Sequence, residues 1–390
     1  MAQPPHGSSR VPRPQRRPRR KHPSAWVFTS GFFLMLCILG LCLVCADRAN
    51  ATVGERDWID AQFTACNRAS CDLKIPAGRF DFSTQLNPSA TVRIEGAGAS
   101  YDNPGIPTRR FPVSEPHCMT TLTWTGGSRP PFLFNNYHEH GSRLAGFCLN
   151  AEGASPPVFI DVDDGAGDIQ LDGIVIDRPS TKAGIAAIRY GQEGFVAGPK
   201  CTDVFVRAAA PIGFELLTID AHFMGMRCRA VWNDQNEWVI GDASRLTESF
   251  HCVFCTAEAR PGNTPVVLMN VRGFFWTDGY TEGAVGFDIP SDATNAQQIT
   301  ITNSWASSGD DTGVVALLRS ALPTATVTLS GNEVLGASAS YIVEDDSISV
   351  ATVVGNTMPS ARVAKNGSNV CAFGNAAATA PMKPASRFCN

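Results

Sequence analysis

After residue 70 the sequence contains no long stretch with the apolar period of a helix, and charged residues make up only 17% of the chain. Without helices to alternate with strands, an α/β fold is disfavoured. Hydrophobic residues make up 44% of the chain, which is ample for a core, and 35 Gly and 26 Pro supply many turns. This composition favours an all-β protein.

Positive charge is scarce beyond the N-terminus. Residues 1–51 hold 8 of the 32 Lys and Arg but only 1 of the 36 Asp and Glu, which leaves 24 basic and 35 acidic residues in the remainder. Nucleic-acid binding depends on a basic surface that neutralises phosphates. We therefore expect no nucleic-acid partner.

No group of residues has the spacing of a metal site. Cys252 and Cys255 have the spacing of half a zinc site, but the sequence holds no second pair of this kind. His222 and His251 have no partner at metal-ligand spacing. We therefore assign no metal-binding residue and interpret these cysteines as structural.

One apolar run stands out near the N-terminus. Residues 1–25 form a basic leader, which we expect to stay in the cytoplasm, and the uncharged run Ala25–Ala46 follows. Residues 26–46 are long enough to cross a bilayer at about 20 residues. They predict either the apolar core of a signal peptide, cleaved near Ala49 and Ala51, or an uncleaved membrane anchor. Both alternatives place the rest of the chain outside the cytoplasm: secreted, periplasmic or membrane-anchored.

Ten cysteines follow this run. An even number in an oxidising compartment suggests disulfide bonds. The pairs that we expect are Cys66–Cys71 and Cys371–Cys389 at the two ends, and Cys201–Cys228 one repeat apart.

Short apolar strands recur about every 27 residues. One series begins at Pro131, Pro157, Ala186, Gly213, Gly286, Gly313, Ser340 and Ala361, with weaker candidates in its gap at Ala230, Ser249 and Pro265. A second series comprises residues 143–150, 169–177, 237–244, 299–304, 327–334 and 350–358. Self-similarity at this period indicates repeats that bury their apolar faces by stacking. We predict a solenoid of parallel strands.

The N-terminal part of this solenoid carries a family resemblance. A helix expected over Glu55–Cys66 precedes IPAGRF (75–80), VRIEGAG (92–98) and TTLTW (120–124), and later turns contain Asn303, Asn332 and Asn356. This order resembles the pectate-lyase-like right-handed parallel β-helix proteins over roughly residues 52–375. The resemblance implies an all-β, single-stranded right-handed parallel β-helix with an N-terminal capping helix and a ladder of asparagines inside one turn. Residues 376–390 are interpreted as a C-terminal tail.

The fold does not define the activity, because it hosts lyases, hydrolases, epimerases and non-catalytic proteins. Gly309-Asp310-Asp311 resembles a segment of polygalacturonase-type hydrolases. The Asn-Thr-Asp, Gly-His-Gly and Arg-x-Lys segments of those enzymes are missing, so we interpret this one as a polar turn.

A row of charged residues is the first candidate site. Alternation in the strands turns Asp161, Arg189, Glu215 and Asp288 outward. Successive rungs lie about 4.8 Å apart, so Asp161, Arg189 and Glu215 should form one row along which a linear sugar polymer can lie. The arginine would neutralise a uronate or abstract a proton, and the carboxylates would hold Ca²⁺ if the protein is a lyase. The alternative is a solvated face with alternating charge.

The irregular middle, residues 227–283, is the second candidate. Asp234 and Glu282 are its candidate catalytic carboxylates. Trp232, Trp276 and Asp278, together with Asp161 of the row, are candidate substrate-binding residues. Insertions that break a repeat often form binding loops. The alternative is that the tryptophans fill the core.

These features predict an exported β-helix protein that acts on an extracytoplasmic polysaccharide as a lyase or glycoside hydrolase. A non-catalytic envelope protein that binds a glycan or a protein is the alternative. A phage tailspike shares the coil but does not explain the export signal.

Overall fold

The computed structural model describes residues 54–101, 116–307, 316–322, 325–335, 341–345, 350–358 and 370–377. All of them belong to one compact unit, Val53–Asn390. The basic leader, the apolar run, Gly309–Asp311, the strand expected at Ala361, and Cys389 lie outside the described residues. Within the described ranges, no helix is both long and apolar enough to cross a membrane.

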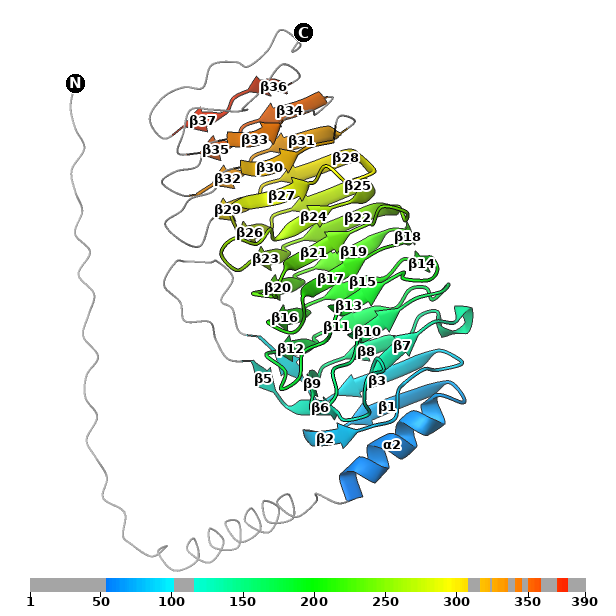
Figure 1. Cartoon of the computed structure of the whole chain (residues 1–390). Helices are drawn as coiled ribbons and strands as arrows, with labels where there is room; N and C mark the ends of the chain where they lie inside the picture. Colours follow the sequence, from blue (N-terminus) through cyan, green and yellow to red (C-terminus); the bar gives the residue numbers. More distant parts are fainter. Residues whose placement is uncertain are drawn as a thin grey trace, which may run out of the picture. The chain divides into compact units, whose positions relative to one another are not determined.

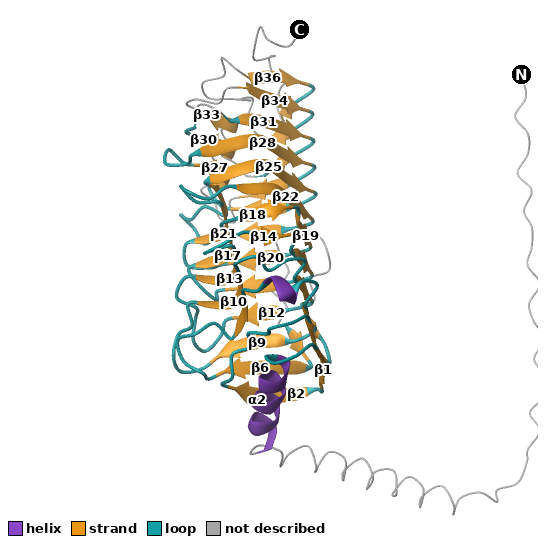
Figure 2. Cartoon of the chain, turned by 90° about the vertical axis from the view of Figure 1, so that its right-hand side faces the viewer, coloured by secondary structure: helices purple, strands orange, loops and turns teal. Residues whose placement is uncertain are grey.

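The described chain winds as a right-handed parallel β-solenoid, as predicted. Each regular coil adds one strand to each of three sheets, in the order C, A and B, and the strands stack in register along one axis (Figures 1 and 2). The pairing within these three sheets is parallel throughout the described strands.

Sheet C has nine strands: β7 (Phe132–Phe134), β10 (Val158–Val162), β13 (Ala186–Tyr190), β17 (Ile212–Leu216), β21 (Asn236–Ile240), β24 (Val266–Leu268), β27 (Val285–Ile289), β30 (Ala316–Ser320) and β33 (Tyr341–Asp345). Sheet B has twelve: β2 (Gly78–Phe82), β6 (Thr120–Trp124), β9 (Cys148–Ala151), β12 (Val175–Asp177), β16 (Phe205–Arg207), β20 (Arg229–Val231), β23 (Thr256–Glu258), β26 (Tyr280–Glu282), β29 (Trp305–Ser307), β32 (Glu333–Val334), β35 (Thr357–Met358) and β37 (Ala376–Ala377).

Sheet A has fourteen: β1 (Cys71–Ile75), β3 (Val92–Gly96), β8 (Arg143–Ala145), β11 (Gln170–Asp172), β14 (Val196–Ala197), β15 (Lys200–Thr202), β18 (Ile219–Ala221), β19 (Phe223–Met226), β22 (Thr247–Val253), β25 (Asn270–Thr277), β28 (Asn295–Thr302), β31 (Thr326–Ser330), β34 (Val350–Val354) and β36 (Val370–Phe373). Outside the stack, β4 (Ala99–Ser100) pairs antiparallel with β5 (His117–Cys118), and a short 3-10 helix spans Tyr137–Glu139.

Within the described residues, the strands of the first predicted series belong to sheet C, apart from two of its weaker candidates. Those at Ala230 and Ser249 were wrong, because they fall on β20 of sheet B and β22 of sheet A. The segments of the second series span strands of sheets A and B together. The reason is that only a two-residue corner separates the sheet A strand of a coil from its sheet B strand. The prediction for residues 237–244 was wrong: this segment contains most of β21, which belongs to sheet C and, with β24, fills the gap in the first series.

Alternation of apolar residues explains the core. In β17 and β21, Phe214 and Trp238 point inward, are fully buried, and stack at 4.1 Å between ring centroids. Burial of a large apolar side chain stabilises the fold by about 1.5–3 kcal/mol. At the N-terminal end, α2 (Gly54–Cys66) covers the first coil with Ile59 and Phe63, as expected of a capping helix.

The corner between sheets A and B has the same backbone in ten successive coils. Its first residue has a positive φ, between 49° and 68°, and its second residue faces the core. The first residues are Gly146, Gly173, Asp203, Arg227, Phe254, Asp278, Asn303, Gly331, Gly355 and Gly374. This left-handed conformation costs about 1–2 kcal/mol for most side chains, while Gly adopts it freely and Asn and Asp visit it more readily than others.

Asparagines occupy the second corner position in the last described coils. The backbone N–H of Asn332 donates to Oδ1 of Asn356, and that of Asn356 donates to Oδ1 of Asn375, both at 2.9 Å. This ladder confirms the expectation for Asn332 and Asn356. The expectation for Asn303 was wrong, because Asn303 takes the exposed first position and Ser304 the buried second one.

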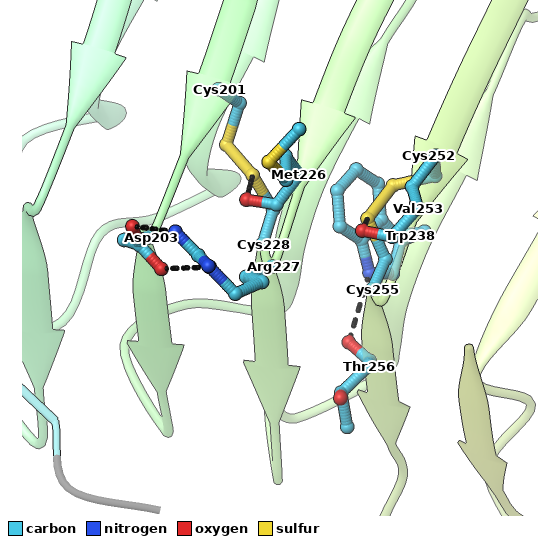
Figure 3. The surroundings of a disulfide bond; sticks show 10 residues. All are labelled: Cys201, Asp203, Met226, Arg227, Cys228, Trp238, Cys252, Val253, Cys255 and Thr256. Atoms are coloured by element: carbon cyan, nitrogen blue, oxygen red, sulfur yellow. Dashed lines mark hydrogen bonds and ion pairs between the residues drawn. A yellow bond between two sulfur atoms is a disulfide. The ribbon is translucent and has the colours of Figure 1, made fainter. Parts of the chain in front are cut away.

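Disulfide bonds fix several coils. Cys66–Cys71 and Cys201–Cys228 form as predicted, Cys118–Cys148 was not foreseen, and Cys252 bonds with Cys255 across one corner. Figure 3 shows the last of these beside Cys201–Cys228. Cys371 is also disulfide-bonded.

Removal of one ladder amide should destabilise the solenoid. In Asn356→Ala, the N–H of Asn332 and the carbonyl of Leu329, which now bond the amide, lose these partners in the core. An unsatisfied buried group costs about 1–3 kcal/mol, so we expect the free energy of unfolding in urea to fall by about 3 kcal/mol. Asn303→Gly is the control and should change it by less than about 0.5 kcal/mol. Equal losses in both variants would contradict a special role of the ladder.

Candidate functional site

A cavity of about 650 Å³ lies on the outer side of the corner between sheets A and B. We call it the corner pocket. One wall is the segment Ala99–Tyr101, which leaves the stack after β3, and the floor is sheet B. The residues of the floor that line it are Phe205, Arg229, Thr256, Tyr280 and Trp305, and the corner residues are Gly173, Asp203, Arg227, Phe254, Asp278 and Asn303.

Aromatic and guanidinium groups build the wall. The Tyr101 ring stacks on Phe205 with centroids 3.8 Å apart and planes 10° apart. The guanidinium of Arg229 lies 5.1 Å from the centroid of the Tyr101 ring, and that of Arg207 lies 5.6 Å from the Phe205 centroid. Such cation–π contacts favour a fixed ring position. The half-buried Tyr101 is therefore an ordered side of the pocket.

Two in-register rows of outward side chains run along sheet B. The corner-side row is Phe205, Arg229, Thr256, Tyr280 and Trp305. The far row is Asp177, Arg207, Val231, Glu258, Glu282 and Ser307. The three-residue strands of sheet B turn only these two positions of each rung outward, so residues 24 to 30 positions apart become neighbours.

Two carboxyl groups stack in the far row. Glu258 and Glu282 are register partners on β23 and β26, about 4.8 Å apart along the sheet. Burial raises the pKa of Glu258, Arg229 opposes this at 3.2 Å, and Glu282 adds to it. The Tyr280 hydroxyl donates to Oε2 of Glu282 at 2.6 Å, and burial followed by the charge of Glu282 raises the pKa of Tyr280. One carboxyl is therefore biased toward the neutral acid, and its neighbour accepts a phenol hydrogen bond.

Every arginine of this face has an acidic partner. Arg207 binds Asp177 through two nitrogens, Arg227 binds Asp203 at 2.6 and 2.7 Å, and Arg229 binds Glu258. Asp278 and Glu282 add further negative charge. An anionic ligand would have to displace a carboxylate, whereas a neutral one would not.

Of the predicted site residues, Asp278 lines the corner pocket and Glu282 lies beside it. Sequence reasoning missed the other participants, Tyr101, Phe205, Arg229, Glu258, Tyr280 and Trp305. The signal for the strand residues was the triplets FVR, RAV, TAE, YTE and WAS, each of which follows a corner dipeptide.

The predicted row of Asp161, Arg189 and Glu215 does exist in register on sheet C. Asp161 and Arg189 are each only 5% exposed and form a bidentate ion pair at 2.8 and 3.1 Å. Burial raises the pKa of Asp161 and of Glu215. This burial fits neither a solvated face nor an open binding row. A side chain that points out of the sheet is not necessarily exposed to solvent. We interpret the row as structural.

Asp288 lies further along the same row. It is 7% exposed and binds Arg319 of the next strand at 2.7 and 2.8 Å. The register continues to Glu344. Asp288 thus forms an acid–arginine pair like that of Asp161 and lies away from the corner pocket.

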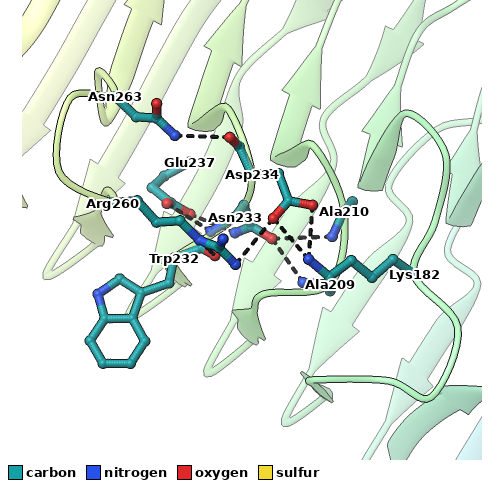
Figure 4. Close-up of polar contacts among 9 residues, drawn as sticks. All are labelled: Lys182, Ala209, Ala210, Trp232, Asn233, Asp234, Glu237, Arg260 and Asn263. Carbon is teal, nitrogen blue, oxygen red and sulfur yellow. Dashed lines mark hydrogen bonds and ion pairs between the residues drawn. The ribbon is translucent and has the colours of Figure 1, made fainter.

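Trp232 and Asp234 lie in the turn from sheet B to sheet C. Asp234 is ion-paired with Lys182 at 2.8 Å and Arg260 at 3.1 Å. The Trp232 ring is 41% exposed and points away from this polar cluster (Figure 4). Asp234 is held as a tie between coils rather than presented to a ligand.

The expectation that Trp276 stacks on a sugar does not fit its position. It is fully buried and packs against Phe274, Phe287 and Trp238. Its inward place follows from the alternation of β25, so it fills the core. Within the described ranges, no cluster of three or more His, Cys, Asp or Glu could hold a metal ion.

No protein-family model matches the chain, and no curated protein sequence matches it. Among solved structures, it is similar to a Geobacillus virus E2 protein (10% identity, TM-score 0.42, 82% of this chain and 58% of that one). It is also similar to the A-module of a mannuronan C-5 epimerase from Azotobacter vinelandii (15%, 0.43, 87% and 95%). A tailspike of an Acinetobacter baumannii bacteriophage, a capsular polysaccharide depolymerase, gives 11%, 0.39, 83% and 52%. The chain thus spans about half the length of two of these proteins.

Glu237 should make stability depend on pH. It is fully buried against Asn233 (Figure 4), and burial raises its pKa to about 8. The folded state thus keeps a proton that the unfolded chain releases above about 4.3, so the free energy of unfolding should fall as pH rises from 4.5 to 8.

We expect Glu237→Gln to abolish this fall in the free energy of unfolding between pH 4.5 and 8, which amounts to a few kcal/mol. Urea unfolding at pH 5 and pH 8 measures it. Glu152→Gln, at an exposed carboxylate, should keep the wild-type slope. An unchanged slope in Glu237→Gln would contradict the assignment.

Proposed function

We propose that this protein is an exported, pectate-lyase-like β-helix enzyme that hydrolyses an extracytoplasmic polysaccharide on sheet B. The observation that carries the proposal is the stacked pair Glu258 and Glu282 beside the corner pocket. Glycoside hydrolases use two carboxyl groups in different protonation states. Here burial favours the acid form of Glu258, while Glu282 accepts the Tyr280 hydrogen bond.

The roles follow from these environments. Protonated Glu258 donates its proton to the glycosidic oxygen as the bond from that oxygen to the anomeric carbon breaks. The charge of Arg229 stabilises the Glu258 carboxylate that remains. Glu282 adds to the anomeric carbon as the nucleophile, because carboxyl groups on rungs about 4.8 Å apart leave no room for a water between them. In a second step water cleaves this ester, and the Glu258 carboxylate takes a proton from that water. Trp305 and the Tyr101–Phe205 stack supply flat surfaces against which sugar rings pack.

The charges of the pocket support a neutral polysaccharide as substrate. Arg207 and Arg227 are already matched by the carboxylates of Asp177 and Asp203, and Arg229 is hydrogen-bonded to Glu258. A uronate in the pocket could bind Arg227 only by displacing Asp203, and would meet Asp278 and Glu282. This pairing favours hydrolysis of a neutral chain over lyase chemistry on a uronate, for which Ca²⁺ was the expected cofactor.

Export fits the disulfide bonds. Four disulfide bonds lie within the described residues, and Cys371 is also disulfide-bonded. Proteins acquire several disulfides in oxidising compartments. With the apolar run of residues 26–46, this supports a location outside the cytoplasm, whether secreted or anchored to the membrane.

Glycan binding without turnover is the second candidate function. It is favoured by the ion pair of Arg229 with Glu258, which gives one carboxyl a structural partner. Binding without release of sugar ends would then be the outcome.

Substitution of either carboxyl should abolish cleavage. We expect Glu258→Gln and Glu282→Gln each to lower kcat by about 100-fold or more, because a general acid or base contributes 10²–10⁴-fold and the first step requires Glu282 as its nucleophile. The assay is the release of reducing ends from glucans, mannan and xylan. In the wild type, activity should also decrease as pH rises through the raised pKa of Glu258.

The matched control is Glu95→Gln. Glu95 lies on sheet A, partly exposed, 3.6 Å from Lys74, and its replacement should leave kcat unchanged. Wild-type rates in both active-site variants would refute the assignment of the pair. Wild-type protein that cleaves none of the polymers, and no uronate polymer, would refute the enzyme itself.

A further inference from the structure

The corner residues of sheets A and B change character where the pocket lies. Glycine takes the first corner position at Gly146, Gly331, Gly355 and Gly374 outside the pocket, and at Gly173 at its edge. The five coils between them carry side chains there: Asp203, Arg227, Phe254, Asp278 and Asn303. All five side chains are exposed, and all five line the corner pocket.

Side chains with positive φ also occur elsewhere in this fold, for example at Trp232 and Ser249. The corner row differs because its own flanking coils show that glycine satisfies the same geometry. In a stack that repeats one backbone, glycine is the least strained choice. Five successive exceptions, confined to the pocket, indicate side chains kept for contact with a ligand.

Arg227 and Phe254 are the two least suited to this conformation. Asp and Asn adopt the left-handed conformation more readily than other residues with side chains. For Arg and Phe its energetic cost is not reduced in this way. Phe254 has φ 55° and a side chain that is 56% exposed, so core packing does not hold it there.

The same two corners are the ones closed by cysteines. Cys228 follows Arg227 and is bonded to Cys201 of the preceding coil. Cys255 follows Phe254 and is bonded to Cys252 (Figure 3). Val253 and Phe254 are the two residues between these cysteines. Both cysteines of this second bond are buried beneath the corner. In the other corners of the row, Val204, Gly279 and Ser304 take that place.

We propose that Arg227 and Phe254 contact the glycan, and that Cys201–Cys228 and Cys252–Cys255 are positioning cross-links that hold them in the left-handed conformation. This inference rests on the proposed function for its ligand. Phe254 offers a ring face to a sugar, and Arg227, neutralised by Asp203, donates hydrogen bonds to hydroxyl groups. Successive corners lie about 4.8 Å apart, so the row contacts several sugar units of a glycan that lies along the solenoid axis.

The conformation can be tested without a ligand. Phe254→Gly and Phe254→Ala remove the same ring, but Ala keeps a Cβ in the left-handed region. We expect a higher Tm for Phe254→Gly than for Phe254→Ala. An equal or lower Tm for the glycine variant would overturn the claim that the corner is strained.

Binding tests the contact. Soluble neutral glucan, mannan and xylan are the probes, with an alginate as the anionic comparison, and the polymer that the wild type binds best is carried forward. We expect Phe254→Ala to weaken binding of that polymer about tenfold, as for the loss of one aromatic contact. Unchanged affinity would overturn the role of Phe254.

A double-mutant cycle tests the cross-link. Replacement of Cys252 and Cys255 by alanine should weaken binding about as much as Phe254→Ala, and should add nothing in the Phe254→Ala background, because both changes remove one contact. The control is replacement of Cys66 and Cys71 by alanine at the far N-terminal coil, which should lower Tm and leave affinity intact. Wild-type affinity in the Cys252/Cys255 variant, or additive losses, would overturn the positioning role.

These results separate the two proposals. Binding that depends on Phe254, without cleavage by the wild type, refutes the hydrolase and retains the corner row. Cleavage that depends on Glu258 and Glu282 but not on Phe254 retains the hydrolase and refutes the corner row.

Discussion

In-register stacking is the constraint on which this structure depends. A coil of three short strands cannot bury its own apolar face, so each coil is stable only against its neighbours. Every inward position must therefore repeat in kind from coil to coil, and every outward position is brought within about 4.8 Å of its equivalents. Residues about 25 positions apart in sequence become a surface, which is how Glu258 and Glu282 meet.

The same constraint governs charge. Like charges stacked in register repel, so a buried row of charges must alternate in sign. Sheet C obeys this rule twice, in Asp161–Arg189–Glu215 and in the pair Asp288–Arg319. Sheet B breaks it, because Glu258 and Glu282 are neighbours without a cation between them in the row. A local violation of a rule that the charged rows of sheet C follow is typical of a functional site. This difference distinguishes the row of sheet B from those of sheet C more clearly than residue type does.

The sequence predicted the coil and two residues at the corner pocket, Asp278 and Glu282, but it placed the row of candidate residues on sheet C. Most strands of sheet C have five residues rich in apolar side chains, as in Val158–Val162, so their period is visible. The strands of sheet B beside the pocket have three residues, as in Tyr280–Glu282, and show no alternation of their own. The corner before such a strand can be recognised in the sequence only where glycine takes its first position. Arg227 and Phe254 take that position without giving this signal. Alternation predicts that Asp161 points outward, but not that it is buried there.

The corner between sheets A and B is stabilised in two different ways along the solenoid. Beyond the pocket, glycine corners are followed by Asn332, Asn356 and Asn375, whose amides bind one another and the backbone. That ladder secures the corner from within and leaves its outer position bare. At the pocket, cysteines replace asparagine at the inner position of Arg227 and Phe254. A covalent cross-link resists relaxation of a strained neighbour, whereas a hydrogen-bonded amide can shift with it. The last described coils thus use amides where the corner only has to be stable, and the corners of Arg227 and Phe254 use disulfides where the corner also has to present a side chain.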